Sequence, residues 1–165
     1  MTMTLRKWPN RMMPIWSWPL RLGGFLVKRF MIDWGSRAEI MYLDLCRGLG
    51  LKDEDLIKYD TPLIGFDRKM VMLVGQIKLL MVTKGKEAMM NFIVVHAFSS
   101  YIAILAWPWI HAIGAVPSTL HLKVKFLTKQ GIVVVRGDQS VAWQCLVAGI
   151  NHKIKQNEQI ELEPL

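Results

Sequence analysis

Short apolar runs separated by polar turns recur along the chain and predict a mostly β protein. We interpret the runs as strands because they are brief, rich in β-branched residues and bounded by Gly, Asp or Lys. They cover residues 25–32, 63–66, 70–73, 76–82, 88–95, 102–105, 120–126 and 132–135. The run at 120–126 alternates apolar and polar residues, as a half-exposed strand does. Short strands at close spacing favour a small closed β-barrel.

Three segments have helical patterns and add short helices to this fold. Residues 37–45 place Ala38, Met41 and Leu45 on one face, which predicts a helix directly after the first long run. Residues 108–113 begin with a proline, which suits the first turn of a helix. Residues 139–150 follow Asp138, a good N-cap, and carry an apolar face.

Residues 92–116 contain no charged side chain, and a stretch of that length could span a bilayer. However, polar residues interrupt it, and its first part is β-branched. Two buried strands joined by a polar turn therefore explain the segment better, and a single-span membrane protein is kept as an alternative. We expect no membrane partner.

The first 22 residues differ in composition from the rest. They are basic, lack acids, and are rich in Trp and Pro, with prolines at 9, 14 and 19 that break both a signal peptide and an amphipathic helix. The expected organisation is a disordered leader at 1–22, a domain at 23–137, a C-terminal helix at 138–150 and a polar tail at 151–165.

The charge distribution excludes a nucleic-acid-binding role for the domain. The net charge is +8, but six basic residues and no acid precede Asp33, so most of the excess lies at the N-terminus. Cys46 and Cys145 lack metal-binding spacing and the histidines are scattered, so we expect no metal and no cofactor. Two reduced thiols suit a cytoplasmic protein.

An acid follows the first apolar run in the sequence Ile32-Asp33-Trp34-Gly35-Ser36. Two further blocks come after it in a fixed order. They are a hairpin around Gly65-Phe66-Asp67 and the run Ala103-Ile104-Leu105-Ala106-Trp107-Pro108-Trp109-Ile110-His111. Asp-x-Gly alone is a weak motif, but these blocks at these separations make it strong.

From about Gly24 to Ile150, the chain resembles a retropepsin-type aspartic peptidase domain. It is most similar to the protease region of the polyprotein of plant gypsy-type long-terminal-repeat retrotransposons. The stretch from Gly114 to His121 and the helix around Gln144–Ala148 also look like that group. The resemblance implies a barrel of the retropepsin-like acid protease type.

The resemblance also implies a mechanism and a homodimer. Two carboxylates in contact share one proton, so that one activates a water molecule and the other polarises the scissile carbonyl of a polypeptide substrate. With a single Asp-x-Gly, the chain must bring two copies of Asp33 together. Gly35 would allow the close approach, Ser36 would hydrogen-bond the carboxylate, and Gly65, Phe66 and Asp67 would form the flap over the substrate. Trp34, Ile104, Leu105 and Ala106 would support the site.

Several residues depart from that family's pattern and predict a weak or inactive enzyme. Trp34 stands where active members have Ser or Thr, whose hydroxyl ties the two loops together, and indole cannot replace it. Ala106 stands where Gly is usual. Trp143, Leu73, Leu127, Lys84 and Lys129 replace Arg, Pro, Pro, Glu and Glu, all reachable by single C-to-T or G-to-A changes. We interpret this as a decaying element copy, with a non-catalytic remnant that dimerises or binds extended peptide as the alternative.

Overall fold

The computed structural model describes residues 3–4, 15–16, 20–61, 63–64, 70–118 and 120–161. Its strands are β1 (Met3–Thr4), β2 (Ile15–Trp16), β3 (Leu20–Leu22), β4 (Phe25–Val27), β5 (Phe30–Ile32), β6 (Glu39–Tyr42), β7 (Leu63–Ile64), β8 (Met72–Thr83), β9 (Lys86–His96), β10 (Ala103–Leu105), β11 (Val116–Ser118), β12 (Lys123–Thr128) and β13 (Gly131–Arg136). Its helices are α1 (Leu43–Gly48), the 3₁₀ helix η1 (Asp53–Asp55), α2 (Trp107–Ala112) and α3 (Gln139–Glu161).

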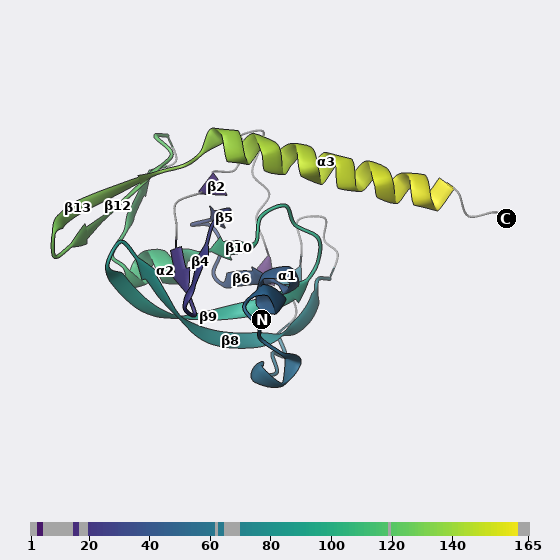
Figure 1. Ribbon diagram of the computed structural model, residues 1–165, viewed down its shortest axis with the longest axis horizontal. Coiled ribbons are helices and arrows are strands. Elements are labelled where there is room, and N and C mark those ends of the chain that lie inside the picture. The colour runs from purple at the N-terminus through teal and green to yellow at the C-terminus, as the bar shows by residue number, and fades with distance from the viewer. Residues whose placement is uncertain are drawn as a thin grey trace.

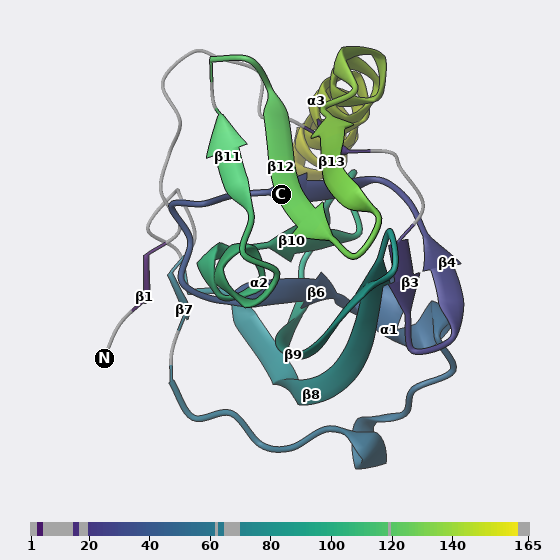
Figure 2. The same cartoon turned by 90° about the vertical axis from the view of Figure 1, so that its left-hand side faces the viewer.

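One large sheet dominates the molecule. Its order is β2-β5-β10-β6-β9-β8-β3-β4, and it curls so that the long β8–β9 hairpin bends around β6 and β10 (Figure 1, Figure 2). The hairpin turns at Lys84 and Gly85, whose φ values of 49° and 80° both lie in the left-handed region, as a tight type I′ turn requires. The predicted mostly β, barrel-like architecture is confirmed.

The central strands of this sheet are buried on both faces. On β9, Phe92 and Val94 belong to the main core, whereas Ile93 and Val95 belong to a second cluster on the other face. The same alternation holds in β5, β6 and β10. A strand covered on both sides has no polar face, which explains the uninterrupted apolar runs in the sequence.

Residues 92–116 form several separate elements. They include the end of β9, all of β10, the six-residue helix α2 and the start of β11. Within the described part of the chain, no helix combines the length and apolarity that crossing a membrane requires. The interpretation of this segment as buried strands is correct, and a single spanning helix through it is wrong.

Two predicted elements around residue 33 are different in the structure. The run at 25–32 is two strands, β4 and β5, with Arg29 in the left-handed region at φ 67° between them. The helix predicted at 37–45 is wrong. Residues 39–42 form β6, which pairs with β9 in parallel and with β10 antiparallel, and only then does α1 begin. Pairing on two sides outweighs the helical spacing of Ala38, Met41 and Leu45.

The sheet begins earlier than residue 23. Strand β2 pairs with β5, and β3 pairs with β4 and β8. Trp16, Leu20 and Leu22 are at most 2% exposed and lie in the main core. Part of the segment expected to be a disordered leader therefore belongs to the fold.

The C-terminal part adds a second layer. Strands β11, β12 and β13 form an antiparallel sheet, and α3 follows it and extends away from the body (Figure 1, Figure 2). The buried side chains Ala142 and Cys145 hold the first turns of α3 against Tyr101. The helix continues to Glu161, beyond the predicted end at 150 and into the predicted tail.

Candidate active site

Asp33 lies on a loop between two strands that a third strand holds together. β10 lies between β5 and β6, parallel to the first and antiparallel to the second. Ile32 pairs with Leu105, and the backbone N–H of Asp33 donates to the Leu105 carbonyl at 2.8 Å. The predicted supporting residues Ile104, Leu105 and Ala106 are therefore directly beside the Asp33 loop, and all three are at most 1% exposed.

The Asp33 carboxylate points inward. The side chain is 1% exposed, and its Oδ1 accepts the backbone N–H of Gly35 at 2.9 Å. Its Oδ2 is buried and has no hydrogen-bond partner. Gly35 itself is exposed, so the tip of the loop reaches the surface while the carboxylate lies beneath it. A buried carboxylate oxygen without a donor is costly to a folded chain.

Ser36 makes contacts that differ from the prediction. Its hydroxyl donates to the Ala38 carbonyl at 3.5 Å instead of to the Asp33 carboxylate. Its backbone carbonyl accepts the N–H of Trp107 at 3.1 Å, which joins the Asp33 loop to the start of α2. In this structure Ser36 therefore fixes the shape of the loop, and Gly35 holds the carboxylate.

Glu39 is a site residue that the sequence analysis missed. It is 1% exposed, and its Oε1 accepts the backbone N–H groups of Ala106 at 3.2 Å and Trp109 at 2.7 Å. Burial raises the pKa of Glu39, and the hydrogen bonds from Trp109 and Ala106 oppose this only in part. The available signal was an acid inside the apolar run Ala38-Glu39-Ile40-Met41, which predicts a buried carboxylate with dedicated partners.

Trp34 packs within its own chain. The side chain is half-buried and lies against the main hydrophobic core. The indole therefore has a place in the fold of a single chain, although it has no hydroxyl to offer to a second loop.

A pair of tyrosines borders the second cluster near the site. Tyr42 and Tyr101 meet edge to face, with ring centroids 5.7 Å apart and an interplanar angle of 75°. Burial raises the pKa of both hydroxyls, and the negative charge of Asp33 raises that of Tyr101 further. Both phenols are therefore neutral across the physiological pH range.

The flap residues Gly65, Phe66 and Asp67 lie outside the described residues, so their predicted role stays a prediction. The described strand β7 leads into that segment. Among the residues that the structure describes, no three His, Cys, Asp or Glu side chains come together as a metal site would require.

Solved structures share this fold. The retroviral protease-like domain of Ddi1 from Leishmania major matches with a TM-score of 0.54 at 14% identity, over 78% of this chain and 96% of that one. EIAV protease in complex with the inhibitor HBY-793 matches with a TM-score of 0.51 at 12% identity, over 66% of this chain and 95% of that one.

No protein-family model and no curated protein sequence matches the chain. The structural matches nevertheless define its fold, because nearly the whole of each neighbour superposes on it. The chain has the fold of the retropepsin-like aspartic proteases, as the sequence predicted.

Proposed function

We propose that this chain is an aspartic endopeptidase domain of the retropepsin type, derived from a plant gypsy-type retrotransposon and weakened by Trp34. The observation that carries the proposal is the Asp33 loop, held by β5, β10 and β6 on a retropepsin-like fold. Its ancestral task would be to process a polyprotein.

The proposed reaction needs two copies of the chain. A pair of Asp33 carboxylates would share one proton, because both cannot ionise cheaply at contact distance. The ionised one would take a proton from water as the water attacks the peptide carbonyl, and the protonated one would donate to the carbonyl oxygen. The unpartnered Oδ2 of Asp33 is the atom available for this exchange.

Two features support reduced activity. Asp33 is 1% exposed, so a second carboxylate and a substrate would reach it only after the groups above it move. Trp34 places a bulky ring without a hydroxyl next to that contact. Both features would make the paired Asp33 site harder to form. Neither would prevent the single chain from folding.

Cleavage of a peptide library by the purified full chain, between mildly acidic and neutral pH, tests the proposal. We expect slow cleavage that Asp33→Asn abolishes and that Trp34→Ser increases by at least tenfold. Cleavage that survives in Asp33→Asn would rule out Asp33 as the catalytic group. Sedimentation analysis of the same samples would show whether activity follows a dimer.

The burial of Asp33 also favours a second candidate function, a non-catalytic remnant that binds extended peptide by strand addition. This candidate predicts that the parent chain and Trp34→Ser both bind peptides without cleaving them. Turnover by either protein contradicts it.

A further inference from the structure

β13 is an open edge of the three-stranded sheet. The sheet order is β11-β12-β13, and within the described chain β13 pairs only with β12. Its side chains on the outer face are exposed, with Ile132 at 72% and Val134 at 43%. An unpaired apolar edge is a template to which another strand can add its backbone hydrogen bonds.

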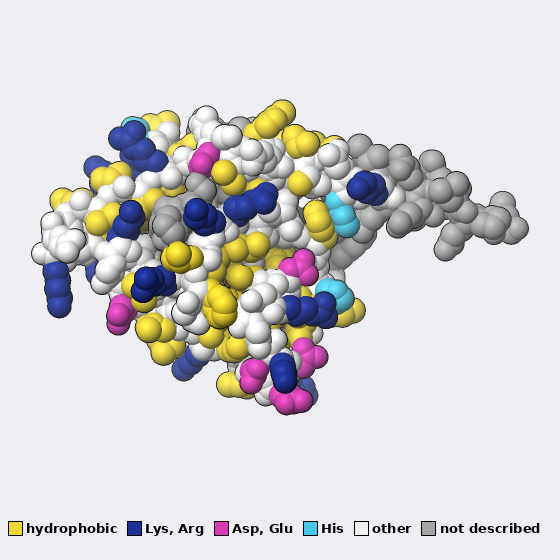
Figure 3. Space-filling model, viewed as in Figure 1, with side chains coloured by type: hydrophobic (Ala, Val, Ile, Leu, Met, Phe, Trp, Pro, Cys, Tyr) yellow, Lys and Arg dark blue, Asp and Glu magenta, His cyan; other side chains and the backbone are white. Residues whose placement is uncertain are grey.

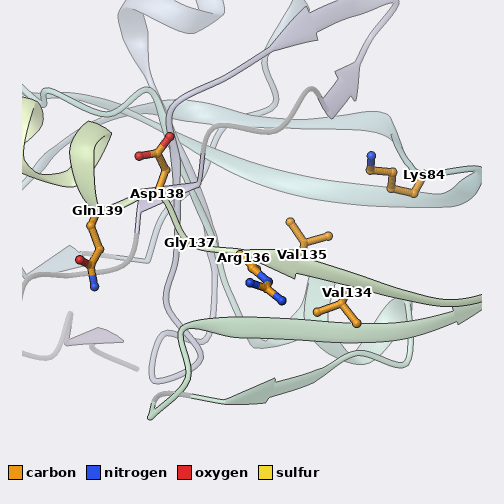
Figure 4. A pocket seen from close by; sticks show the side chains of 7 residues that line it. All are labelled: Lys84, Val134, Val135, Arg136, Gly137, Asp138 and Gln139. Carbon is orange, nitrogen blue, oxygen red and sulfur yellow. The ribbon is translucent and has the colours of Figure 1, made fainter.

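An open hollow of about 590 Å³ lies beside this edge (Figure 4). It is lined by Lys84, from the turn between β8 and β9, and by residues 134–139. Figure 4 shows Lys84 on the side of the hollow opposite Val134 and Arg136. The free edge of β13 therefore has room next to it for one more extended chain.

The surroundings of this edge are basic. In the ladder between β12 and β13, Lys123 pairs with Arg136, so two cations stand side by side. No acid occurs in the sequence between Glu87 and Asp138, and Asp138 is used to cap α3 by accepting the N–H of Val141 at 3.1 Å. Like charges directly opposite each other are destabilising, so this edge would gain from a nearby carboxylate.

The space-filling view shows the same asymmetry. Many Lys and Arg side chains lie on the side where β12 and β13 are, with few Asp and Glu among them, and a group of acids lies at the lower end of the molecule (Figure 1, Figure 3). None of Lys84, Lys123 and Arg136 forms an ion pair with a carboxylate of the described residues.

We propose that β13 binds an extended segment of a partner protein in which apolar and acidic residues alternate and the last apolar position is also taken by an acid. The segment would add to the β13 edge as a fourth strand. Ile132, Val134 and Arg136 share one face of β13, so on that face two apolar side chains of the segment would cover Ile132 and Val134 and a carboxylate would reach Arg136. The carboxylates on its other face would reach Lys84, which lies across the hollow from Val134 and Arg136 (Figure 4). This surface shares no residue with the Asp33 loop, so it is independent of any peptidase activity.

The charge and the side-chain types of this edge favour an acidic protein segment over a second copy of the chain or a nucleic acid. A second copy pairing edge to edge through β13 would supply no carboxylate, because residues 131–136 contain none, and it would add a second Arg136 to an edge that is already basic. A nucleic acid would meet the aliphatic side chains Ile132 and Val134 here, and not the aromatic rings on which bases stack.

Fluorescence anisotropy with the labelled peptide Val-Glu-Val-Glu-Glu tests the proposal on the full chain, because its first, third and fifth side chains share one face and can lie across from Ile132, Val134 and Arg136. We expect binding that weakens at least tenfold in the double variant Lys84→Glu, Arg136→Glu. It should stay unchanged in Lys78→Glu, a single charge reversal at an exposed position on β8. Circular dichroism of each variant confirms that the fold is kept.

Two control peptides separate strand addition from simple charge attraction. The same peptide methylated at each backbone nitrogen keeps its side chains but cannot pair with a strand, and it should not bind. A polyglutamate peptide lacks the apolar face and should bind at least tenfold more weakly. The proposal is overturned if either control peptide binds as tightly as the parent peptide, or if the parent peptide does not bind. It is also overturned if the chain forms a dimer that the Lys84→Glu, Arg136→Glu variant dissociates.

Discussion

The strands around Asp33 and the strands β11–β13 use similar apolar residues but have different surroundings. β5, β6 and β10 are covered on both faces by core clusters. In β12 and β13, one face holds Val124, Phe126 and Val135 in the core, while the other exposes Leu127 and Ile132. Burial on both faces holds the strands that flank the Asp33 loop in place, whereas burial on one face leaves a surface for a partner.

Removing a large core side chain near the Asp33 strand should have the largest effect. Trp16 is 0% exposed and lies on β2, which pairs with β5. We expect Trp16→Ala to lower the free energy of unfolding by about 3–5 kcal/mol, because it leaves a cavity. Urea unfolding measures this.

Trp143→Ala is the matched control for that experiment, because Trp143 is 58% exposed on α3. It should change stability by about 0.5 kcal/mol or less. A loss of stability in Trp16→Ala as small as that in Trp143→Ala would show that the segment before residue 20 does not belong to the core.

The next largest effect should come from Glu39. Replacing it with Ala leaves the buried N–H groups of Ala106 and Trp109 without an acceptor, which we expect to cost about 2–3 kcal/mol. Glu39→Gln keeps an accepting oxygen and should cost less. If Glu39→Gln is as unstable as Glu39→Ala, the charge of Glu39 and not its accepting oxygen contributes the stability.

Glu39 also predicts a pH dependence of stability. Because burial raises its pKa above the ordinary 4.5, the folded chain holds its proton more tightly than the unfolded chain does. The stabilisation from this group is therefore fully present below pH 4.5 and is lost as the pH rises through its folded pKa. In urea unfolding at several pH values, Glu39→Gln should lack this loss, and an unchanged pH profile would contradict the assignment.

The smallest effect should come from the outer face of the second sheet. Leu127→Ser and Ile132→Ser change side chains that are 64% and 72% exposed, and each should alter stability by about 0.5 kcal/mol or less. Thermal unfolding checks this. A loss above about 1 kcal/mol would indicate that another part of the same chain covers this face.

The sequence predicted the strands better than it predicted their boundaries and partners. The runs that became β9, β10 and β13 are mostly apolar and the run that became β12 alternates, so their patterns are informative without knowledge of their neighbours. The two runs predicted at 70–73 and 76–82 are one strand, β8, with an irregularity between Leu73 and Gly75. β6 was mistaken for a helix because both of its faces are buried, and a strand buried on both faces lacks the alternation that identifies a strand.

The candidate site was predictable in part for a similar reason. Asp33 and the Ile104–Ala106 block belong to a local motif, so the sequence located both, and the structure places them side by side. The role of Glu39 depends on backbone N–H groups far along the chain, at Ala106 and Trp109. The contact of Trp16 with the core depends on a strand pairing that its proline-rich neighbourhood does not suggest.

The position of β10 between β5 and β6 also sets the order in which the chain can fold. The β8–β9 hairpin joins neighbouring residues, so its loop closes at little entropic cost and it can form early. The Asp33 loop must wait for Leu105 to return from much farther along the chain. During synthesis on the ribosome, the Asp33 loop therefore stays unformed until residues 103–105 have emerged, so a nascent chain cannot assemble its site early.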